Sequence, residues 1–485
     1  MPVCYNSMGG SISKGVRGSV ALTAALILAA GQGTRMKSER LKVLHEVCGR
    51  PMVEYVIETA QRATGQKPFL VIGYQAESVK EALGDKALYV MQTVQKGTGH
   101  AVMQAVPYLT GKYDEVIVLY GDCPLLSPKT LSGLIEHRRR TGASCAVLTF
   151  QPKDPYGYGR IVRGEGDRIA RIVEHRDAGP AELAMNEVNS GIYCFDASAL
   201  LNALPLLRDD NAQREFYITD VLSILNQTSR ACVACEAENA EECLGINDRR
   251  ALAEVSLIVR RRILDDLMLS GVTVDDPAST FVDAGVEIGP DTRIMPHTFL
   301  KRKTRVGKCC VIGPQTLIDE SIIGDEVTIS FSVIEKSRVE DRASLGPFSH
   351  LRPGSVIGED AQIGNYAEIK NSTIGRGSKI HHHTYVGDSS LGERVNFSAG
   401  AITVNYDGRR KHRTDIGDGA FIGCNVNLVA PVKVGKDAFV AAGSTVTDEV
   451  PSGALAIARE RQTNKEGWVA KKRNQGNEAG KKTPQ

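Results

Sequence analysis

An aliphatic residue returns at every sixth position through much of the C-terminal half of the sequence. Two runs keep this step without a slip: Val339, Leu345, Leu351, Ile357, Ile363 and Ile369, then Ile416, Ile422, Leu428, Val434, Val440 and Val446. An amphipathic helix repeats its apolar positions at about 3.6 residues and a half-buried strand at 2. A six-residue period is instead typical of a parallel β-helix, in which each hexad forms one short side of a coil and points its aliphatic residue inward. The sequence therefore predicts a β-helix in this half.

The length and charge of the chain limit its class and its partners. At 485 residues it exceeds what one hydrophobic core usually fills, so at least two domains are expected. The net charge is +2, with acidic and basic residues interspersed, which gives no electrostatic reason to expect a nucleic acid or a membrane as partner. The 11 cysteines are an odd number spread over both halves, which favours reduced thiols and a cytoplasmic location.

The N-terminal segment imitates a secretory signal, because Lys14 and Arg17 precede the apolar run 20–30. The same run leads into the glycine-rich turn Gly31-Gln-Gly-Thr-Arg35, which the first domain needs. We therefore interpret residues 1–20 as a disordered extension and 24–30 as the first buried strand.

Residues 21–248 have the pattern of an α/β domain. Short apolar runs at 26–30, 69–73, 116–120 and 144–150 alternate with helical patterns at 51–63 and 76–83. Such alternation predicts a parallel sheet whose ligands bind beyond the carboxyl ends of the strands. The loops after Ala30 and Tyr120 both leave strands at that edge.

The first of these loops suits a phosphate group. Gly31-Gln-Gly-Thr-Arg-Met matches neither the dinucleotide-binding nor the Walker pattern. Its glycines still allow backbone N–H groups to approach phosphate oxygens, and Arg35 and Lys42 add positive charge.

The remaining segments are a linker, the coil and a tail. Residues 249–271 have apolar residues at helical spacing, with Arg260-Arg-Arg262 on the other face, which predicts a linker helix. The hexads of 272–462 are interrupted by the basic segment 403–415, which we expect to leave the coil as a binding loop. Residues 463–485 are poor in apolar residues and are expected to be largely disordered.

The motifs of the first half resemble, in order, those of sugar-nucleotide pyrophosphorylases. The matching strings are Leu28-Ala-Ala-Gly-Gln-Gly-Thr-Arg-Met36, Leu41-Lys-Val-Leu44, Gly97-Thr-Gly-His-Ala101, Leu119-Tyr-Gly-Asp122, Gly157-Tyr-Gly-Arg160, Ile172-Val-Glu-His175, Asn189-Ser-Gly191 and Gly245-Ile-Asn247. Joined to a hexapeptide coil, this order resembles the bifunctional GlmU family of bacteria over about 26–468. That family combines N-acetylglucosamine-1-phosphate uridyltransferase with glucosamine-1-phosphate N-acetyltransferase. The implied fold is a Rossmann-like nucleotidyltransferase domain, a linker helix and a left-handed parallel β-helix.

The resemblance implies an N-terminal site for UTP and Mg²⁺. Asp122 and Asn247 match the family's Mg²⁺ ligands, and a carboxylate and an amide oxygen suit this hard cation. Arg35 and Lys42 match catalytic positions that hold phosphate groups. The nucleotide sugar is expected to contact Leu28, Ala29, Ala30, Gly31, Lys42, Gln92, Gly97, Thr98, Tyr120, Gly121, Asp122, Gly159, Glu174, Asn189 and Asn247. Within this set Gln92, Gly97 and Thr98 match the positions that read uracil, and Gly159, Glu174 and Asn189 match those that hold the sugar.

The resemblance also implies a C-terminal site for acetyl-CoA. His382 matches the family's proton acceptor, and strand alternation would point His381 and His383 to the other side. The acetyl-acceptor sugar phosphate is expected to contact Arg352, Lys370, Tyr385 and Asn396. The positions that match acetyl-CoA contacts are Ala399, Asn405, Tyr406, Cys424, Ala442 and Arg459. Cys424 stands where a small hydroxyl residue is expected, which puts that contact in doubt. The family is homotrimeric, with each acetyl site shared between neighbouring coils.

Two other functions share parts of this pattern. A single-activity pyrophosphorylase of the ADP-glucose or GDP-mannose type could carry the coil for assembly or regulation. Subunits of a eukaryotic nucleotide-exchange factor share the domain order without being enzymes. His382, Arg352 and Lys370 favour the bifunctional enzyme over the first, and Lys42 and Asp122 favour retained chemistry over the second. We therefore expect an enzyme that makes UDP-N-acetylglucosamine for wall or surface polymers.

Overall fold

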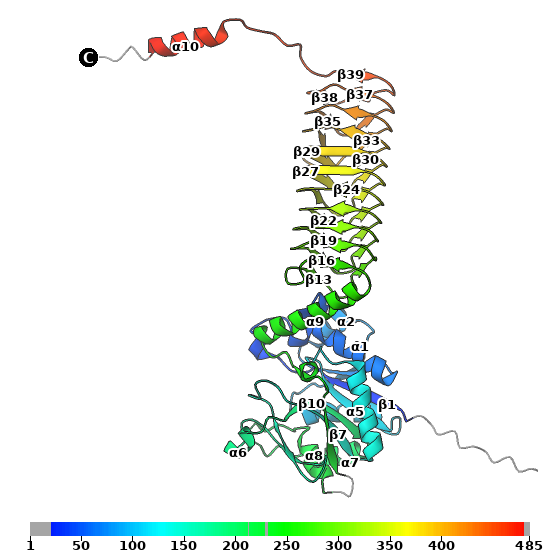
Figure 1. The fold of residues 1–485 in the computed structure, drawn as a ribbon, viewed down its shortest axis with the longest axis vertical. Coiled ribbons are helices and arrows are strands. Elements are labelled where there is room, and N and C mark those ends of the chain that lie inside the picture. Colours follow the sequence, from blue (N-terminus) through cyan, green and yellow to red (C-terminus); the bar gives the residue numbers. More distant parts are fainter. Residues whose placement is uncertain (1–20, 212, 228–230, 480–485) are drawn as a thin grey trace, which may run out of the picture. The chain divides into compact units, whose positions relative to one another are not determined.

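The computed structural model describes residues 21–211, 213–227 and 231–479 (Figure 1). The extension expected at 1–20 lies outside the described residues. The chain divides into two compact units, Met1–Arg260 and Arg261–Gln485. The boundary falls inside helix α9 (Arg249–Leu269), which covers most of the segment where a linker helix was expected.

The first unit is built on a sheet with the strand order β11-β7-β10-β6-β1-β4-β5. Its strands are β1 (Thr23–Leu28), β4 (Phe69–Ile72), β5 (Leu88–Met91), β6 (Glu115–Tyr120), β7 (Cys145–Phe150), β10 (Val188–Asp196) and β11 (Cys232–Glu236), with β8 (Arg160–Arg163) and β9 (Ile169–Val173) attached to β10. A separate short pair consists of β2 (Glu46–Val47) and β3 (Arg50–Pro51). Strands β4 and β6 flank β1 and run parallel to it, so the loops after β1 and β6 leave the same edge.

The prediction of a parallel sheet is wrong for β10 and for the β8–β9 pair attached to it. β10 runs antiparallel to both β6 and β7. A parallel neighbour requires a crossover, usually a helix packed on the sheet, whereas an antiparallel neighbour does not. Between β7 and β10 the chain forms only the antiparallel β8–β9 pair and the single-turn helix α6 (Pro180–Leu183), so it returns to the sheet in the opposite direction.

Helices cover both faces of this sheet because alternate residues of its strands enter two cores. Ala25 and Ile27 of β1 pack in one core with α1 and α5, while Ala24 and Leu26 pack in the other with α7 and α8. The helices of this unit are α1 (Met52–Thr64), α2 (Ala76–Leu83), α3 (Thr98–Met103), α4 (Val106–Leu109), α5 (Pro128–Thr141), α7 (Ala197–Ala203) and α8 (Asp220–Leu225). The 3₁₀ turns are η1 (Thr34–Met36), η2 (Lys42–Leu44), η3 (Leu204–Leu206) and η4 (Ala240–Cys243).

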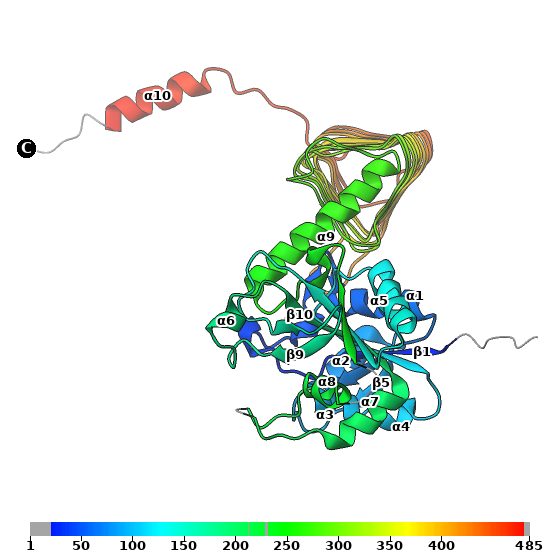
Figure 2. The ribbon, with the colours of Figure 1, turned by 60° about the horizontal axis from the view of Figure 1, so that its bottom comes forward.

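The second unit is the parallel β-helix that the hexads predicted, and its outline in cross-section is triangular (Figure 2). The first face contains β12 (Thr273–Val274), β15 (Arg293–Ile294), β18 (Val311–Ile312), β21 (Thr328–Ile329), β24 (Ser344–Leu345), β31 (Asn396–Phe397), β34 (Phe421–Ile422), β37 (Phe439–Val440) and β39 (Leu455–Ala456). The second face contains β13 (Phe281–Val282), β16 (Phe299–Lys301), β19 (Leu317–Asp319), β22 (Val333–Glu335), β25 (His350–Leu351), β32 (Ile402–Val404), β35 (Asn427–Val429) and β38 (Thr445–Val446). The third face contains β14 (Glu287–Ile288), β17 (Arg305–Val306), β20 (Ile322–Ile323), β23 (Arg338–Val339), β26 (Val356–Ile357), β28 (Thr373–Ile374), β30 (Ser389–Leu391), β33 (Thr414–Ile416) and β36 (Val432–Val434).

Two longer strands bend from the first face to the second. β27 (Gln362–Lys370) begins beside β24 on the first face and ends beside β25 on the second, and β29 (Lys379–Gly387) runs alongside it. The predicted aliphatic positions fill the coil: Leu351, Ile357 and Ile369 are fully buried. Parallel register places Leu351 next to Ile369, so each coil stacks its hexad residue on the next. The first strand of the coil, β12, starts at Thr273.

The tail differs from the predicted disorder. Helix α10 (Trp468–Ala479) occupies part of the segment 463–485, and 480–485 lies outside the described residues. Most residues of this helix are Ala, Lys, Arg, Gln or Glu, which have high helix propensity. The prediction of disorder rested on the low apolar content of the tail, which does not measure helix propensity. Over the described part of the chain, no helix combines the length and apolar character needed to cross a membrane.

Candidate functional sites

The glycine-rich loop after β1 is shaped around Lys42. Gly33 adopts a left-handed conformation with φ of 65°, and a Cβ atom there would overlap Lys42 Cβ. Only glycine combines that backbone conformation with the absence of a side chain. The loop then enters η1 with Met36 N donating to Gly33 O at 3.0 Å. The sequence thus places Lys42 directly under the loop that was expected to wrap phosphate.

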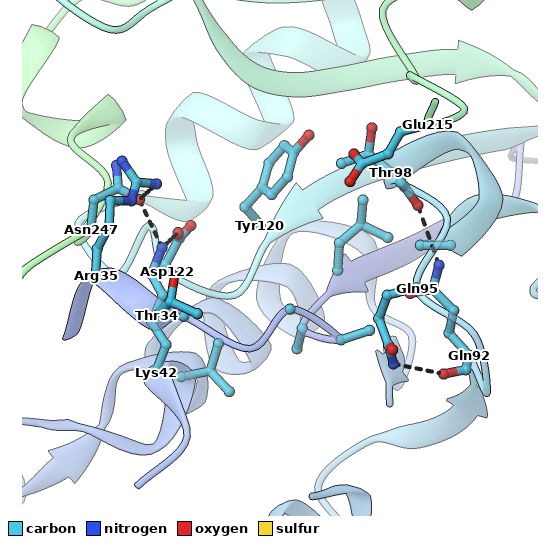
Figure 3. A pocket seen from close by; sticks show the side chains of 18 residues that line it. Thr34, Arg35, Lys42, Gln92, Gln95, Thr98, Tyr120, Asp122, Glu215 and Asn247 are labelled. Carbon is cyan, nitrogen blue, oxygen red and sulfur yellow. Dashed lines mark hydrogen bonds and ion pairs between the residues drawn. The ribbon is translucent and has the colours of Figure 1, made fainter. Parts of the chain in front are cut away.

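Asp122 and Asn247 come together at the carboxyl edge of the sheet (Figure 3). The Lys42 ammonium forms an ion pair with Asp122 and donates to Asn247 Oδ1 at 2.8 Å. Arg35 Nη2 donates to the same Asn247 oxygen at 2.8 Å. The loop that carries Asp122 is tied to the loop that carries Asn247, because Ile246 N donates to Asp122 O at 2.9 Å. A carboxylate oxygen and an amide oxygen therefore converge on one cationic group.

The opposite end of this hollow contains the residues expected to read uracil. Gln92 is buried, and its Nε2 lies 3.0 Å from His100 Nδ1 and 3.3 Å from Gly97 O. Burial, reinforced by Lys96, lowers the pKa of His100, so its neutral imidazole accepts this hydrogen bond. The two contacts hold the Gln92 amide in one orientation, which leaves its carbonyl oxygen for a ligand.

A hollow of about 460 Å³ brings these groups together, and a wider depression lies beside it. Its lining includes the predicted Leu28, Ala29, Ala30, Gly31, Arg35, Lys42, Gln92, Gly97, Thr98, Tyr120, Asp122 and Asn247. The lining does not include the predicted Gly121, where a Cβ atom would lie 3.2 Å from Val53 Cγ2. Figure 3 shows Tyr120 between the two ends of the hollow.

The three residues expected to hold the sugar line the adjoining depression. Asn189 N donates to Gly159 O at 2.8 Å, and Asn189 Nδ2 donates to Tyr193 OH at 2.7 Å. A Cβ atom on Gly159 would lie 3.6 Å from Glu174 Oε2, so the three residues are neighbours. Burial, with smaller contributions from Asp177 and Asp220, raises the pKa of Glu174. A carboxylate with few competing partners suits the hydroxyl groups of a sugar.

Glu215 is a lining residue that the sequence analysis missed. It lies beside Thr98 in Figure 3 and lines both the hollow and the depression. Its loop is docked on the end of the hollow that contains Gly97 and Thr98, since Phe216 N donates to Lys96 O at 2.8 Å and Gly99 N donates to Phe216 O at 2.7 Å. The short turn that presents Glu215 has no periodicity, so only this docking identifies it.

In the second unit, His382 is exposed and has a defined orientation. Its Nδ1 lies 2.8 Å from Asn365 Oδ1 on the neighbouring coil. An amide oxygen accepts but cannot donate, so Nδ1 carries the proton and Nε2 is left with a lone pair. The predicted alternation of His381, His382 and His383 does not hold, because His383 sits at a corner with φ of 48° and ends the straight segment. Asn365 was also missed, since it lies a full coil away in sequence.

Basic residues gather on the second face where strands β25 and β27 end. Arg352 Nη1 donates to Glu368 Oε1 at 2.9 Å, and the nearby ammonium group of Lys411 lowers the pKa of Lys370. Lys411, which the sequence analysis did not single out, comes from the basic loop. Tyr385 and Asn405 stand beside this cluster, with Asn405 Nδ2 3.4 Å from Tyr385 OH. Asn396, the remaining predicted contact to the sugar phosphate, lies on the first face and is not brought to this cluster.

The basic loop leaves the coil after β32, as the interruption of the hexads predicted, and returns as β33. Asp407 holds it by accepting from Arg409 N at 2.7 Å, Arg410 N at 2.6 Å and His412 Nε2 at 2.7 Å. These donors, Arg410 N first, lower the pKa of Asp407 to about 2. Asn405 is anchored by its Nδ2 donating to Asp388 Oδ2 at 2.5 Å, while Tyr406 remains exposed.

The other residues expected to bind acetyl-CoA follow His382 along one line. Ala399, Cys424 and Ala442 each stand one position before a corner, as His382 does. Cys424 is exposed, and Arg459 lies close to Ala442, because a Cβ atom on Gly443 would be 3.6 Å from Arg459 Cδ. No group of three or more His, Cys, Asp and Glu side chains suited to a metal occurs among the described residues.

Comparison with known proteins gives matches for both units. The family model of the MobA-like NTP transferase domain matches residues 25–220, and that of the bacterial transferase hexapeptide (six repeats) matches 413–448. Curated relatives that carry the name "Bifunctional protein GlmU" align over nearly the whole chain. The relative from Brevibacillus brevis is 51% identical, covering 91% of this chain and 96% of its own length. Relatives from Geobacillus sp. and Halalkalibacterium halodurans are 50% and 49% identical, covering 92% and 93% of this chain and 97% and 99% of their own lengths.

Proposed function

Because the chain belongs to the GlmU family of bifunctional proteins, we propose that each of its two units carries one transferase site with the residues described above. The enzyme makes UDP-N-acetylglucosamine in two steps. An acetyl group passes from acetyl-CoA to glucosamine 1-phosphate, and a uridylyl group then passes from UTP to N-acetylglucosamine 1-phosphate with release of pyrophosphate. A pyrophosphorylase with a merely structural coil is not favoured, because the bifunctional relatives match both units.

The contact of Lys42 with Asp122 and Asn247 carries the proposal for the first site. A phosphate oxygen of the sugar attacks the α-phosphorus of UTP while the bond to the β-phosphate oxygen breaks. The protein contributes position and charge, since there is little covalent help to give. Lys42 and Arg35 would stabilise the negative charge that moves onto pyrophosphate. Gln92 Oε1 would accept the uracil N3–H, and Glu174 and Asn189 would hold the sugar hydroxyl groups.

The residues present fit a Mg²⁺ ion. Asp122 Oδ2 and Asn247 Oδ1 both contact one ammonium group, so two oxygens of the kind that a hard cation prefers can reach a common point. When bound there, Mg²⁺ would neutralise phosphate charge. Arg35 donates to the same Asn247 oxygen and so sets its direction.

The hydrogen bond between His382 and Asn365 carries the proposal for the second site. With its Nδ1 proton held by Asn365, His382 presents Nε2 as the proton acceptor for the sugar amine. The amine nitrogen forms a bond to the thioester carbonyl carbon, the carbon–sulfur bond breaks, and coenzyme A leaves as the thiolate. Arg352, Lys370 and Lys411 supply the positive charge that a sugar phosphate requires. The assembly proposed for this site is a homotrimer, and the proposed location of the enzyme is the cytoplasm.

The two sites can be tested separately with two variants. We expect Asp122→Ala to lose uridylyl transfer and keep acetyl transfer, and His382→Ala to do the reverse. The assays supply UTP, Mg²⁺ and N-acetylglucosamine 1-phosphate for the first, and acetyl-CoA and glucosamine 1-phosphate for the second. Circular dichroism melts of each variant control for loss of folding. A single substitution that removes both activities from a folded protein would contradict the assignment.

A further inference from the structure

His100 belongs to the motif Gly97-Thr-Gly-His-Ala101, but the proposed function uses only the first two residues of that motif. It lies on helix α3, behind the end of the hollow that contains Gln92 (Figure 3). The lining of the hollow and that of the adjoining depression do not include it. Any effect of His100 on a ligand must therefore pass through a residue that does line the hollow, and its ring contacts Gln92.

The side-chain amide of Gln92 uses both of its N–H groups inside the protein. Gln92 is 3% exposed, and its Nε2 lies 3.3 Å from Gly97 O and 3.0 Å from His100 Nδ1. A carbonyl oxygen can only accept, so Gly97 fixes which end of the amide is the nitrogen. His100 Nδ1 accepts the second N–H group, which places the imidazole proton on Nε2. Among the described residues none donates to Gln92 Oε1, so this oxygen is left for the ligand.

The elements around the His100 ring hold it in this contact. Phe216 stacks on the ring, with ring centres 6.4 Å apart and an angle of 29° between the planes. Because burial and the nearby Lys96 ammonium lower the pKa of His100, the ring is neutral and Nδ1 keeps its lone pair. On the other side Gln104 Nε2 lies 3.3 Å from His100 Nε2. Gln104 is half-buried, so its amide can turn its oxygen toward the proton there.

Uracil and cytosine differ in what they present at N3. The N3–H group of uracil donates a hydrogen bond, whereas N3 of cytosine has a lone pair and accepts one. A buried oxygen that faces N3 therefore favours uracil, because with cytosine it would be left without a donor. Cytosine would require the Gln92 amide to rotate by half a turn. Its oxygen would then take the place of Nε2, 3.3 Å from Gly97 O, where two acceptors repel each other, and the His100 proton would have to move to Nδ1.

We propose that His100 is a positioning residue that makes the first unit specific for uridine nucleotides, because it holds the Gln92 amide with its oxygen toward the base. The inference rests on the proposed function, in which UTP occupies the hollow and Gln92 accepts from uracil N3–H. It adds the residue that decides between uracil and cytosine without touching either. The base lies at the opposite end of the hollow from Lys42 and Asp122, so this contact is made equally in the ground state and in the transition state. Its loss should raise KM for UTP and leave kcat nearly unchanged.

Two variants of nearly equal shape test the role of Nδ1. In His100→Asn the side-chain oxygen takes the place of Nδ1 and still accepts, whereas in His100→Leu a methyl group takes that place and accepts nothing. His100→Leu should raise KM for UTP about five- to tenfold, which corresponds to one hydrogen bond. The ratio of kcat/KM for UTP to kcat/KM for CTP should fall at least about tenfold, because UTP loses a contact and CTP gains one. His100→Asn should restore both values.

The assay measures pyrophosphate release from UTP or CTP with N-acetylglucosamine 1-phosphate and Mg²⁺. Acetyl transfer by the same preparations and calorimetric melts report on folding. If His100 only supports helix α3, both nucleotides lose kcat/KM alike, the ratio stays unchanged, and His100→Asn shows the same loss as His100→Leu. An unchanged ratio or a failure of His100→Asn to restore it would overturn the inference.

A further comparison does not depend on the folding of His100→Leu. In His100→Ala the imidazole ring is absent, and added imidazole should lower KM for UTP and raise the ratio of UTP to CTP again. No response to imidazole would count against the role of the ring. A wild-type enzyme that releases no pyrophosphate from UTP would overturn the proposed function itself. Wild-type activity together with an unchanged ratio in His100→Leu would overturn the role of His100 alone.

Discussion

A methyl group at Gly33 should disable uridylyl transfer far more than it destabilises the protein. Gly33 has φ of 65°, where a residue with a Cβ atom costs about 1–2 kcal/mol. The added methyl would also overlap Lys42 Cβ, and the start of a side chain cannot swing aside as its far end can. Lys42 must therefore shift, and with it the ammonium that lies 2.8 Å from Asn247 Oδ1. A displacement of about 1 Å in such a group lowers the rate about 100-fold, which corresponds to about 2.7 kcal/mol of transition-state energy.

Gly65→Ala is the matched control for this change. Gly65 ends helix α1 with φ of 68°, but a Cβ atom there meets no other atom within 4 Å. Gly65→Ala thus has the backbone strain without the overlap and should keep full uridylyl transfer. The measurements are kcat/KM for pyrophosphate release, acetyl transfer as an internal reference, and calorimetric melting of each variant. The reasoning fails if Gly33→Ala retains wild-type kcat/KM, or if Gly65→Ala loses as much activity as Gly33→Ala.

Glu115 is fully buried, which by itself would raise its pKa, but hydrogen bonds from Arg139, Thr23 and Arg138 together lower it below the ordinary value. Ionised Glu115 therefore contributes its full stabilisation of the folded protein above the carboxyl pKa of the unfolded chain, about 4.3. This contribution is lost as the pH falls through the pKa of Glu115 in the folded protein. Glu115→Gln should cost about 1.5–3 kcal/mol at neutral pH, because Arg139 is partly exposed and Arg138 keeps its ion pair with Asp196, and it should flatten the acid side of a calorimetric stability profile. Among the described cysteines, exposed Cys309 and Cys424 should react with a thiol reagent in the folded protein, whereas burial raises the pKa of Cys123 and of Cys194, the latter to about 12, and should protect both. Acetyl-CoA should slow labelling of Cys424 but not of Cys309, which peptide mass spectrometry distinguishes. Asn365→Ala should lower acetyl transfer about tenfold through loss of one orienting hydrogen bond, and Asn365→Asp, which still accepts, should restore it.

The coil was predictable because its period is a property of the sequence itself. Each hexad residue such as Leu351 or Ile357 is buried inside the coil, so the six-residue period of the sequence is also the period of the structure. The sheet of the first unit was less predictable. Apolar runs located β1, β4, β6 and β7, but direction depends on the connections between strands, and the connection before β10 has no helical pattern.

The candidate sites were predictable only where a motif marks them. Lys42, Asp122 and Asn247 lie far apart in sequence, and the resemblance rather than any spacing grouped them. The sequence did not predict Asn365, Glu215 or Lys411, because each reaches its candidate site through a contact with another coil or loop. The His381–His383 argument failed for a related reason, since strand alternation does not continue through a corner with positive φ.

The two units face different problems in enclosing a ligand. In the first, loops rise from one edge of a sheet and surround the hollow, so the whole hollow is built by one copy of the chain. The outer surface of a three-sided coil is convex, and outward side chains diverge from one another. Such a coil can build a pocket with a loop that leaves it, as the segment anchored by Asp407 does, or by standing beside another copy. Acetyl transfer should therefore depend on assembly, whereas uridylyl transfer should not, even though one chain performs both.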